Sequence, residues 1–291
     1  RPVRNIMKAL PTPENLNQAW RWFRNDRTVW QRGQRRQDMQ QNYARHLLEM
    51  HNALKEGDYR PEPVRRFTLR QGDGKVRELA NLALKDKIAQ RALLQVLQPY
   101  FEARFHPDSF GYRPGRNTEM AAGLARTRIL EGHRYLVHTD IEKFFDRVPH
   151  RPLKRCIKDR IRDRKARALL FRWLDAHATQ PARWWRGARG IPQGGILSPF
   201  LANLYLDGLD WELARRKICF VRYADDLLLL ARSERQMRRY HRILRRLLRR
   251  LGLRMNASKT TTGPVRKDQR YLGHRLPHDD PRAPRKGLAR R

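Results

Sequence analysis

Two adjacent aspartates, Asp225 and Asp226, lie between two apolar runs and constrain the fold more than any other feature of this sequence. The run 218–221 precedes them and the run 227–230 follows, and each is long enough for one buried strand. The short gap between the runs predicts a tight hairpin with both carboxylates at its tip. Such a pair carries a desolvation and repulsion cost, which a bound divalent cation would relieve. A solvated Asp-Asp turn is the alternative, because aspartate is common in turns.

The charge of the chain predicts a polyanionic partner. The 291 residues include 65 Lys+Arg and 29 Asp+Glu, which gives a formal net charge of +36, and the excess runs along the whole chain. A compact body with this charge repels itself, so nucleic acid is the expected partner. A membrane is disfavoured, because no apolar stretch approaches the about 20 residues of a spanning helix and no signal peptide is visible.

The two cysteines, Cys156 and Cys219, are too few for a disulfide framework or a zinc site. Both have apolar neighbours, and we expect buried thiols in a reducing cytoplasm. The chain starts at Arg1 and not at a methionine, so we expect a trimmed product or a piece of a longer one.

Hydrophobic periodicity predicts an α+β fold in which helices pack on a sheet. The predicted helices are 13–56 (in the main), 85–105, a segment from about 118, 152–178, a segment from 198 and 234–251. The predicted strands are 64–70 and 75–79, joined by an Asp-Gly turn, then 135–141 and the two runs around 223–226.

Asp140 ends the predicted strand 135–141 and offers a third carboxylate. Carboxylates that converge from separate strands can hold two Mg²⁺ ions about 3.5–4 Å apart. Such a pair would activate an attacking 3′-hydroxyl and stabilise a leaving pyrophosphate. Mg²⁺ keeps water and phosphate among its ligands, which suits a sparse set of acids. Taken alone, Asp140 would be a strand-end or helix-capping residue.

Three ordered motifs resemble those of reverse transcriptases, with the closest match to the group II intron-type lineage. They are Asp-Ile-Glu-Lys-Phe-Phe-Asp at 140–146, Gly-Ile-Pro-Gln-Gly-Gly-Ile-Leu-Ser-Pro at 190–199 and Tyr-Ala-Asp-Asp at 223–226. Supporting segments are 110–116, 201–206 and 271–274, and the resemblance covers about 60–276. It implies the fingers and palm of a right-hand polymerase, with an antiparallel palm sheet packed on helices.

The resemblance also implies a division of the chain. The expected parts are an N-terminal helical extension at 1–59, fingers at 60–134, a palm at 135–276 that is helical over 150–189, and a basic tail or linker at 277–291. That tail is too short for a helical thumb. We therefore expect the thumb to lie outside this chain, or its work to be done by a partner domain.

For the chemistry, the resemblance implies that Asp140, Asp225 and Asp226 bind two Mg²⁺ ions, and that the backbone carbonyl of Ile141 is a further ligand. The resemblance also implies that Mn²⁺ can substitute for Mg²⁺. It implies that Lys259 protonates the leaving pyrophosphate. An ordinary loop lysine is the alternative for Lys259.

Other residues fall where the family contacts the nucleotide. Phe145 would select the sugar, because a bulky ring there collides with a ribose 2′-hydroxyl; an ordinary core phenylalanine is the alternative. Gln193 and Gly194 would lie against the incoming nucleotide and the template, where a missing side chain permits close approach. A plain turn is the alternative for this pair.

Two further groups complete the expected site. The residues expected to meet the triphosphate are Lys75, Arg77 and Arg70, with solvated surface charge as the alternative. The residues expected to grip the primer backbone are Tyr271, Leu272 and Gly273. Without the resemblance, the segment 271–274 would be interpreted only as a strand.

The leading hypothesis is an RNA-directed DNA polymerase that acts on an RNA template, a DNA or RNA primer and dNTPs. A non-catalytic RNA-binding module of the same fold is the main alternative, and the complete set of acids argues against it. A fragment of an intron mobility protein is another, although no maturase or nuclease segment is visible. An RNA-synthesising polymerase is disfavoured by Phe145. By analogy, a role in CRISPR adaptation with a fused or bound integrase fits this reduced core.

Overall fold

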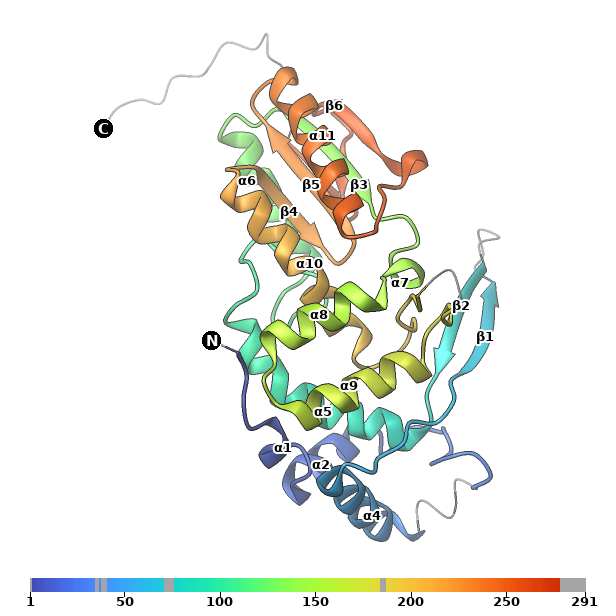
Figure 1. Ribbon diagram of the computed structural model, residues 1–291. Coiled ribbons are helices and arrows are strands. Elements are labelled where there is room, and N and C mark those ends of the chain that lie inside the picture. The colour runs from blue at the N-terminus through green and yellow to red at the C-terminus, as the bar shows by residue number, and fades with distance from the viewer. Residues whose placement is uncertain (1, 35–36, 38–40, 71–75, 184–186, 278–291) are drawn as a thin grey trace, which may run out of the picture. The chain divides into compact units, whose positions relative to one another are not determined.

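The computed structural model describes residues 2–34, 37, 41–70, 76–183 and 187–277 (Figure 1), without the side chains of 70 and 76–78. It is an α+β fold whose four-stranded sheet is antiparallel, as the resemblance implies. The chain divides into two compact units. The first comprises Arg1–His106, Glu142–Gly208 and Arg250–Leu253, and the second comprises Pro107–Ile141, Leu209–Arg249 and Arg254–Arg291. Within the described residues, no helix combines the length and the apolar character needed to cross a membrane.

The first unit consists of helices and one two-stranded ribbon. Its helices are α1 (Ile6–Ala9), α2 (Pro13–Arg21), α4 (Tyr43–Glu56), α5 (Leu84–Glu102), α7 (Phe144–Arg147), α8 (His150–Arg160), α9 (Arg164–Ala176) and the first part of α10 (Ser198–Arg215). The ribbon pairs β1 (Arg65–Arg70) with β2 (Val76–Asn81) in antiparallel register. The hairpin predicted around the Asp-Gly turn is therefore present, while its turn lies outside the described residues.

A buried acid ties the core of the first unit together. Asp86 of α5 is fully buried and accepts hydrogen bonds from the Tyr59 hydroxyl, the Trp173 indole and the backbone N–H of Glu62. Burial nevertheless raises the pKa of Asp86, because removal from water disfavours its charged form. The acid thus links α5 to α9 and to the segment before β1.

The helix expected over 13–56 is interrupted. Residues 22–34 form turns and irregular backbone between α2 and α4. Asp26 accepts from both the backbone N–H and the hydroxyl of Thr28, and it pairs with Lys87. Such local side-chain bonds compete with helical backbone bonds, which explains why the helical pattern does not continue here.

The second unit is built on a four-stranded sheet. Its order is β4 (Cys219–Tyr223), β5 (Asp226–Ala231), β3 (Tyr135–Asp140) and β6 (Thr261–Pro264). In the β3–β5 register, Asp140 lies opposite Asp226 and Tyr135 lies opposite Ala231. Antiparallel pairing thus brings the end of β3 and the start of β5 to one end of the sheet.

Alternation along the strands separates the two faces of this sheet. One face packs on α6 (Thr118–Leu130) in a buried cluster that includes Ala121, Ala125, Leu136, Val221, Leu228 and Leu230. Asp226 shares this face with Leu228 and Leu230 because it lies at even spacing from them. The last turns of α10 and helix α11 (Glu234–Arg250) lie over the opposite face (Figure 1).

Two short elements follow α11. The first is the 3₁₀ turn η1 (Ala257–Lys259), which precedes β6. The second is a tight hairpin of β7 (Arg270–Tyr271) and β8 (His274–Arg275), with Leu272 and Gly273 in left-handed conformations at its turn. The string 271–274 is therefore a turn between two short strands and not one continuous strand.

Candidate active site

The acidic hairpin predicted from the sequence is present. Strands β4 and β5 pair with Tyr223 opposite Asp226, so Ala224 and Asp225 form a two-residue turn. Ala224 has a φ of 57°, in the left-handed region that a residue with a Cβ adopts only at a cost. Surrounding contacts must therefore hold this turn in place.

Strand pairing brings the three aspartates together. Asp140 lies opposite Asp226, and the backbone N–H of Ile141 donates to the carbonyl of Asp225 at 3.1 Å. The pKa of Asp225 is raised, mainly by burial and further by the negative charges of Asp140 and Asp226; a backbone hydrogen bond and the charge of Lys259 oppose the rise. The site therefore concentrates negative charge that the protein neutralises only in part.

Two basic side chains reach the acids. The ammonium of Lys259 lies 2.6 Å from Oδ2 of Asp140, and Nε2 of His138 lies 2.9 Å from Oδ1 of Asp226. Lys259 thus contacts a predicted metal ligand, as a residue working at this site must. His138 was not singled out from the sequence, although its place two residues before Asp140 on β3 puts both side chains on one face.

One oxygen of Asp140 makes this site suited to a cation. Oδ1 of Asp140 is buried and has no hydrogen-bond partner in the described part of the chain. Among the described residues, no three acidic, histidine or cysteine side chains form a ready-made metal cage. Mg²⁺ does not need one, because it binds through one or two carboxylates and completes its shell with water and phosphate. The unpartnered oxygen of Asp140, close to the mutually repelling carboxylates of Asp225 and Asp226, fits that pattern.

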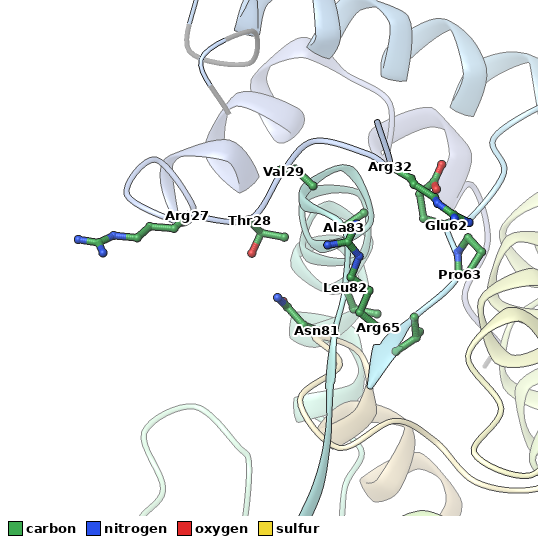
Figure 2. Close-up of a pocket in the computed structure, with 11 residues that line it drawn as sticks. Arg27, Thr28, Val29, Arg32, Glu62, Pro63, Arg65, Asn81, Leu82 and Ala83 are labelled. Carbon is green, nitrogen blue, oxygen red and sulfur yellow. The ribbon is translucent and has the colours of Figure 1, made fainter. Parts of the chain in front are cut away.

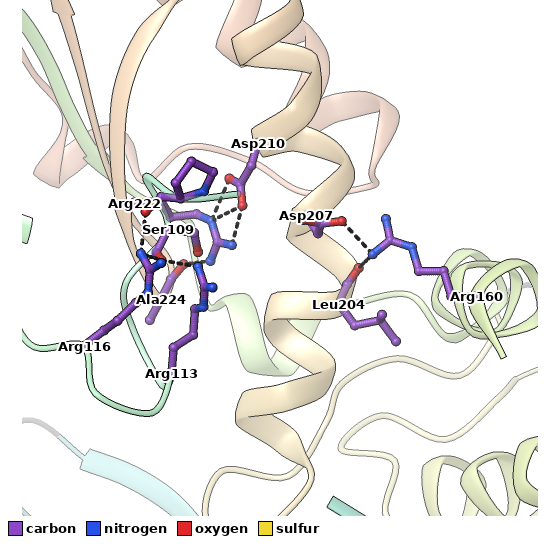
Figure 3. Close-up of polar contacts among 10 residues, drawn as sticks. Ser109, Arg113, Arg116, Arg160, Leu204, Asp207, Asp210, Arg222 and Ala224 are labelled. Atoms are coloured by element: carbon purple, nitrogen blue, oxygen red, sulfur yellow. Dashed lines mark hydrogen bonds and ion pairs between the residues drawn. The ribbon is translucent and has the colours of Figure 1, made fainter. Parts of the chain in front are cut away.

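An ion pair on the α10 side of the sheet holds the hairpin turn (Figure 3). Arg222 and Asp210 are both completely buried and paired at 2.6 Å, with further hydrogen bonds from Nε of Arg222 to the same carboxylate. The guanidinium also donates to the carbonyl of Ala224 at 2.8 Å. No local sequence pattern indicates this pair, which connects α10 directly to the turn that carries Asp225.

The segment 107–116 supports the same turn from the edge of β4. The N–H of Phe110 donates to the carbonyl of Arg222, and the N–H of Arg222 donates to the carbonyl of Asp108. A Cβ at Gly111 would lie 2.2 Å from the backbone nitrogen of Ala224. Glycine is therefore required at 111 by close packing against the acidic hairpin, a role that the sequence analysis did not assign.

The predicted nucleotide-contacting residues that the structure describes lie in the first unit. Phe144 is buried and Phe145 is half-buried, with their rings edge to face at 5.4 Å, so the two do point differently. The carbonyl of Gln193 accepts from the N–H of Ala80 on β2 at 2.8 Å. Gly194 has a φ of 97°, and a Cβ there would lie 2.8 Å from the carbonyl oxygen of Ala80. Close packing against β2 therefore requires glycine at 194, independently of any contact with a nucleotide.

The expected triphosphate contacts cannot be placed. Lys75 lies outside the described residues, and so do the side chains of Arg70 and Arg77, although their backbones belong to β1 and β2.

Of the expected primer grip, Tyr271 is a core residue. It is 1% exposed, its hydroxyl donates to the carbonyl of Val221 at 3.4 Å, and its ring lies edge to face with His138. Burial raises the pKa of Tyr271 well above its ordinary value. Leu272 and Gly273 form the turn that follows, in which Leu272 is half-buried against the cluster on the α6 face and Gly273 is exposed.

A pocket of about 470 Å³ lies at the open end of the β1–β2 ribbon (Figure 2). Its charged lining residues are Arg27, Arg32, Arg65 and Glu62. Glu62 also pairs with Lys85 at 2.8 Å. None of the site residues expected from the sequence lines this pocket.

Comparison with known proteins identifies relatives over most of the chain. Residues 69–276 match the family described as reverse transcriptase (RNA-dependent DNA polymerase). Protein YkfC of Escherichia coli K12 is 28% identical over 316 residues, which cover 94% of this chain and 83% of YkfC. The group II intron-encoded protein LtrA of Lactococcus lactis subsp. cremoris is 34% identical over 200 residues, which cover 68% of this chain and 32% of LtrA. The chain thus spans about a third of that intron-encoded protein.

Solved structures share the fold. A partial Cas6-RT-Cas1–Cas2 complex contains a chain with 22% identity and a TM-score of 0.50, matched over 85% of this chain and 42% of that one. Apo telomerase from Candida tropicalis, truncated from its C-terminal domain, has 15% identity and a TM-score of 0.53 over 72% of this chain and 52% of that one. The family match and the shared fold agree with the motifs: this chain belongs to the reverse transcriptases, a family of RNA-directed DNA polymerases that generally use divalent metal ions.

Proposed function

We propose that this chain extends a primer 3′-hydroxyl with deoxynucleotides on an RNA template, and that Asp140, Asp225 and Asp226 hold two Mg²⁺ ions for the reaction. The observation that supports this most is that Oδ1 of Asp140 is buried and has no hydrogen-bond partner in the described part of the chain. The raised pKa of the neighbouring Asp225 supports it further. Binding RNA alone would not favour acids clustered this way, since carboxylates repel a phosphate backbone.

Bound metal ions would lower the pKa of the attacking hydroxyl and stabilise the leaving pyrophosphate. The protein's own part is to position groups. His138 orients the carboxylate of Asp226, and Arg222 fixes the turn that carries Asp225. The Lys259 ammonium, 2.6 Å from Asp140, would give the departing pyrophosphate its proton. Ile141 would contribute its backbone carbonyl to the metal site.

Primer extension tests the proposal directly. The purified chain is given an RNA template, an annealed DNA primer, Mg²⁺ and either dNTPs or rNTPs. We expect extension with dNTPs that a chelator abolishes, and no extension by the Asp225→Ala/Asp226→Ala double variant. If the wild-type protein binds the template but never extends the primer under any of these conditions, the chain is a non-catalytic RNA-binding module and the proposal is wrong.

A second prediction concerns the sugar. Phe145→Ala removes the ring proposed to collide with a ribose 2′-hydroxyl, so rNTP incorporation relative to dNTP should rise, on the order of 10- to 100-fold. The ratio of kcat/KM values for the two nucleotides measures this. Phe144→Leu, a change at the buried neighbouring ring, is the control and should leave the ratio nearly constant. An unchanged ratio in Phe145→Ala would remove Phe145 from the proposed role.

The biological setting is part of the same proposal. Sequence similarity to LtrA supports intron mobility, while the shared fold with a Cas6-RT-Cas1–Cas2 complex makes spacer acquisition with an integrase partner worth testing. We place the protein in the cytoplasm, which is compatible with two free cysteines. The genes that adjoin this one, or the sequence beyond residues 1 and 291, would distinguish the two settings: an integrase indicates spacer capture, and a maturase region indicates an intron.

A further inference from the structure

Helix α11 carries a continuous strip of arginines that takes no part in the site described above. Seven residues form this arginine face: Arg235, Arg238, Arg239, Arg242, Arg245, Arg246 and Arg249. All seven are exposed. At about 100° per residue they fall within an arc of about 120°, and at about 1.5 Å per residue they extend over about 21 Å.

The fold itself does not account for the arginine face. Glu234 pairs with Arg238 at 2.5 Å, and within the described residues the other six arginines form no salt bridge. Several of the seven are spaced four residues apart, as are Arg235 and Arg239, and like charges at that spacing destabilise a helix. A self-repelling strip of this kind is relieved when a polyanion lies along it.

The chemistry of the strip suits phosphate. All its cations are arginines, whose planar guanidinium groups bind phosphate oxygens through two parallel hydrogen bonds. Its length is enough to follow several successive phosphates, which in duplex DNA recur about every 3.4 Å along a strand. A lipid surface fits less well, because helices that bind membranes insert an apolar face. Here that face is already buried in the protein, through Met237, Tyr240, Leu244, Leu247 and Leu248.

The position of the strip separates it from the aspartates. Helix α11 lies over the face of the sheet opposite α6 (Figure 1), whereas Asp226 shares the α6 side with Leu228 and Leu230. The arginines that would bind a nucleic acid along the outer side of α11 are therefore different groups from the aspartates proposed to bind metal.

We propose that the arginine face of α11 is a second nucleic-acid surface, which holds the phosphate backbone of a folded RNA while another part of the RNA is copied. The choice of RNA over DNA rests on the proposed function. The surface itself rests only on the exposure, spacing and charge of the seven arginines.

Equilibrium binding tests the proposal without catalysis. The probe is a fluorescent RNA hairpin of about 20 base pairs, measured by anisotropy between 50 and 200 mM salt with the polymerase site saturated by unlabelled primer–template. The variant is Arg239→Gln/Arg242→Gln/Arg246→Gln. Each lost phosphate contact lowers the slope of log affinity against log salt by about 0.9, so we expect a slope smaller by about 2–3 and affinity reduced about 10- to 100-fold at 100 mM salt.

The control removes the same charge elsewhere: Arg151→Gln/Arg155→Gln/Arg164→Gln changes exposed residues of α8 and α9 in the other unit. It should keep the wild-type slope. A charge-conserving Arg239→Lys/Arg242→Lys/Arg246→Lys variant should bind better than the glutamine variant, which would show that affinity follows the positive charge of the strip.

Several results would overturn the proposal. Equal losses in the control variant would show that the whole protein attracts RNA diffusely. Complete displacement of the hairpin by primer–template would place it in the polymerase site. An unchanged RNA affinity, with lost binding to phosphatidylserine vesicles or polyglutamate, would assign the strip to a membrane or an acidic protein. Tighter binding of a DNA hairpin of the same sequence would contradict the choice of RNA. No step of this experiment requires synthesis, so its results can be interpreted even if primer extension fails.

Discussion

Asp225→Asn is expected to slow nucleotide addition by about a thousandfold and yet to raise the stability of the metal-free protein at neutral pH. The rate falls because an amide replaces a carboxylate proposed to bind the catalytic metal ions, whose charge stabilisation is worth several kcal/mol, and about 4 kcal/mol corresponds to about a thousandfold. Single-turnover primer extension measures this effect directly.

The expected rise in stability follows from the pKa of Asp225. That pKa is raised in the folded protein, first by burial and then by Asp140 and Asp226, so the folded state binds the proton more tightly than the unfolded chain does. This contribution to stability is complete below the ordinary pKa of aspartate and is lost as the pH rises through the raised value. At pH 7 the ionised carboxylate therefore costs stability, and asparagine removes that cost.

Thermal unfolding in chelator, followed from pH 7 down to pH 3, checks the sign. The melting temperature of Asp225→Asn should exceed that of wild type at pH 7, and the difference should disappear in acid. Added Mg²⁺ should stabilise wild type more than the variant, since a ligand stabilises the state that binds it. Two results would contradict this account of the site. One is a melting temperature of Asp225→Asn below that of wild type at pH 7 in chelator, and the other is a Mg²⁺-induced rise in melting temperature as large as that of wild type.

The parts of this site that sequence could predict are those set by local pattern. Two apolar runs around a short acidic gap favour a hairpin, and Asp140 at the end of another apolar run lies opposite Asp226 once the strands pair antiparallel. The Asp-Gly ribbon in the first unit was predictable for the same reason. Each of these features depends on neighbours along the chain and on the two-residue period of a strand.

The features that sequence could not predict depend on long-range burial. Asp210 lies in a helix next to Trp211 and Glu212, and its local sequence is typical of a surface acid. It is nevertheless fully buried, because Arg222 of the following strand β4 folds back against α10 and neutralises it. Gly111 has no local signal for its packing against Ala224. Tyr271 was assigned to the primer because of its motif, while its burial in the core depends on the whole sheet.

Arg222→Ala is expected to destabilise the protein by about 3–5 kcal/mol, because it leaves the carboxylate of Asp210 buried without a partner. It should also remove the hydrogen bond that holds the carbonyl of Ala224 in its left-handed turn. Urea unfolding measures the first effect. Loss of stability alone, however, does not show that Arg222 positions the aspartates.

The double variant Arg222→Met/Asp210→Leu separates the two effects. Replacing both members of a buried ion pair by apolar side chains of similar volume is often neutral for stability, so this variant should regain most of what Arg222→Ala loses. Its hairpin turn still lacks the guanidinium, and we expect primer extension to stay about 10- to 100-fold slow and to require more Mg²⁺, as for lost groups that orient metal ligands. Calorimetric titration with Mn²⁺ supplies a reading of metal affinity that does not depend on activity.

A second arginine–aspartate pair on the same helix provides the control. Arg160 and Asp207 pair at 2.7 Å (Figure 3), and Arg160 is partly exposed. Arg160→Met should lower stability less than Arg222→Ala and leave the Mg²⁺ requirement unchanged, because Arg160 binds Asp207 and the carbonyl of Leu204 on α10 and not the carbonyl of Ala224. If Arg222→Met/Asp210→Leu regains both stability and wild-type Mg²⁺ dependence, the buried pair serves the fold alone and the strained turn at Ala224 is held by the segment 107–116.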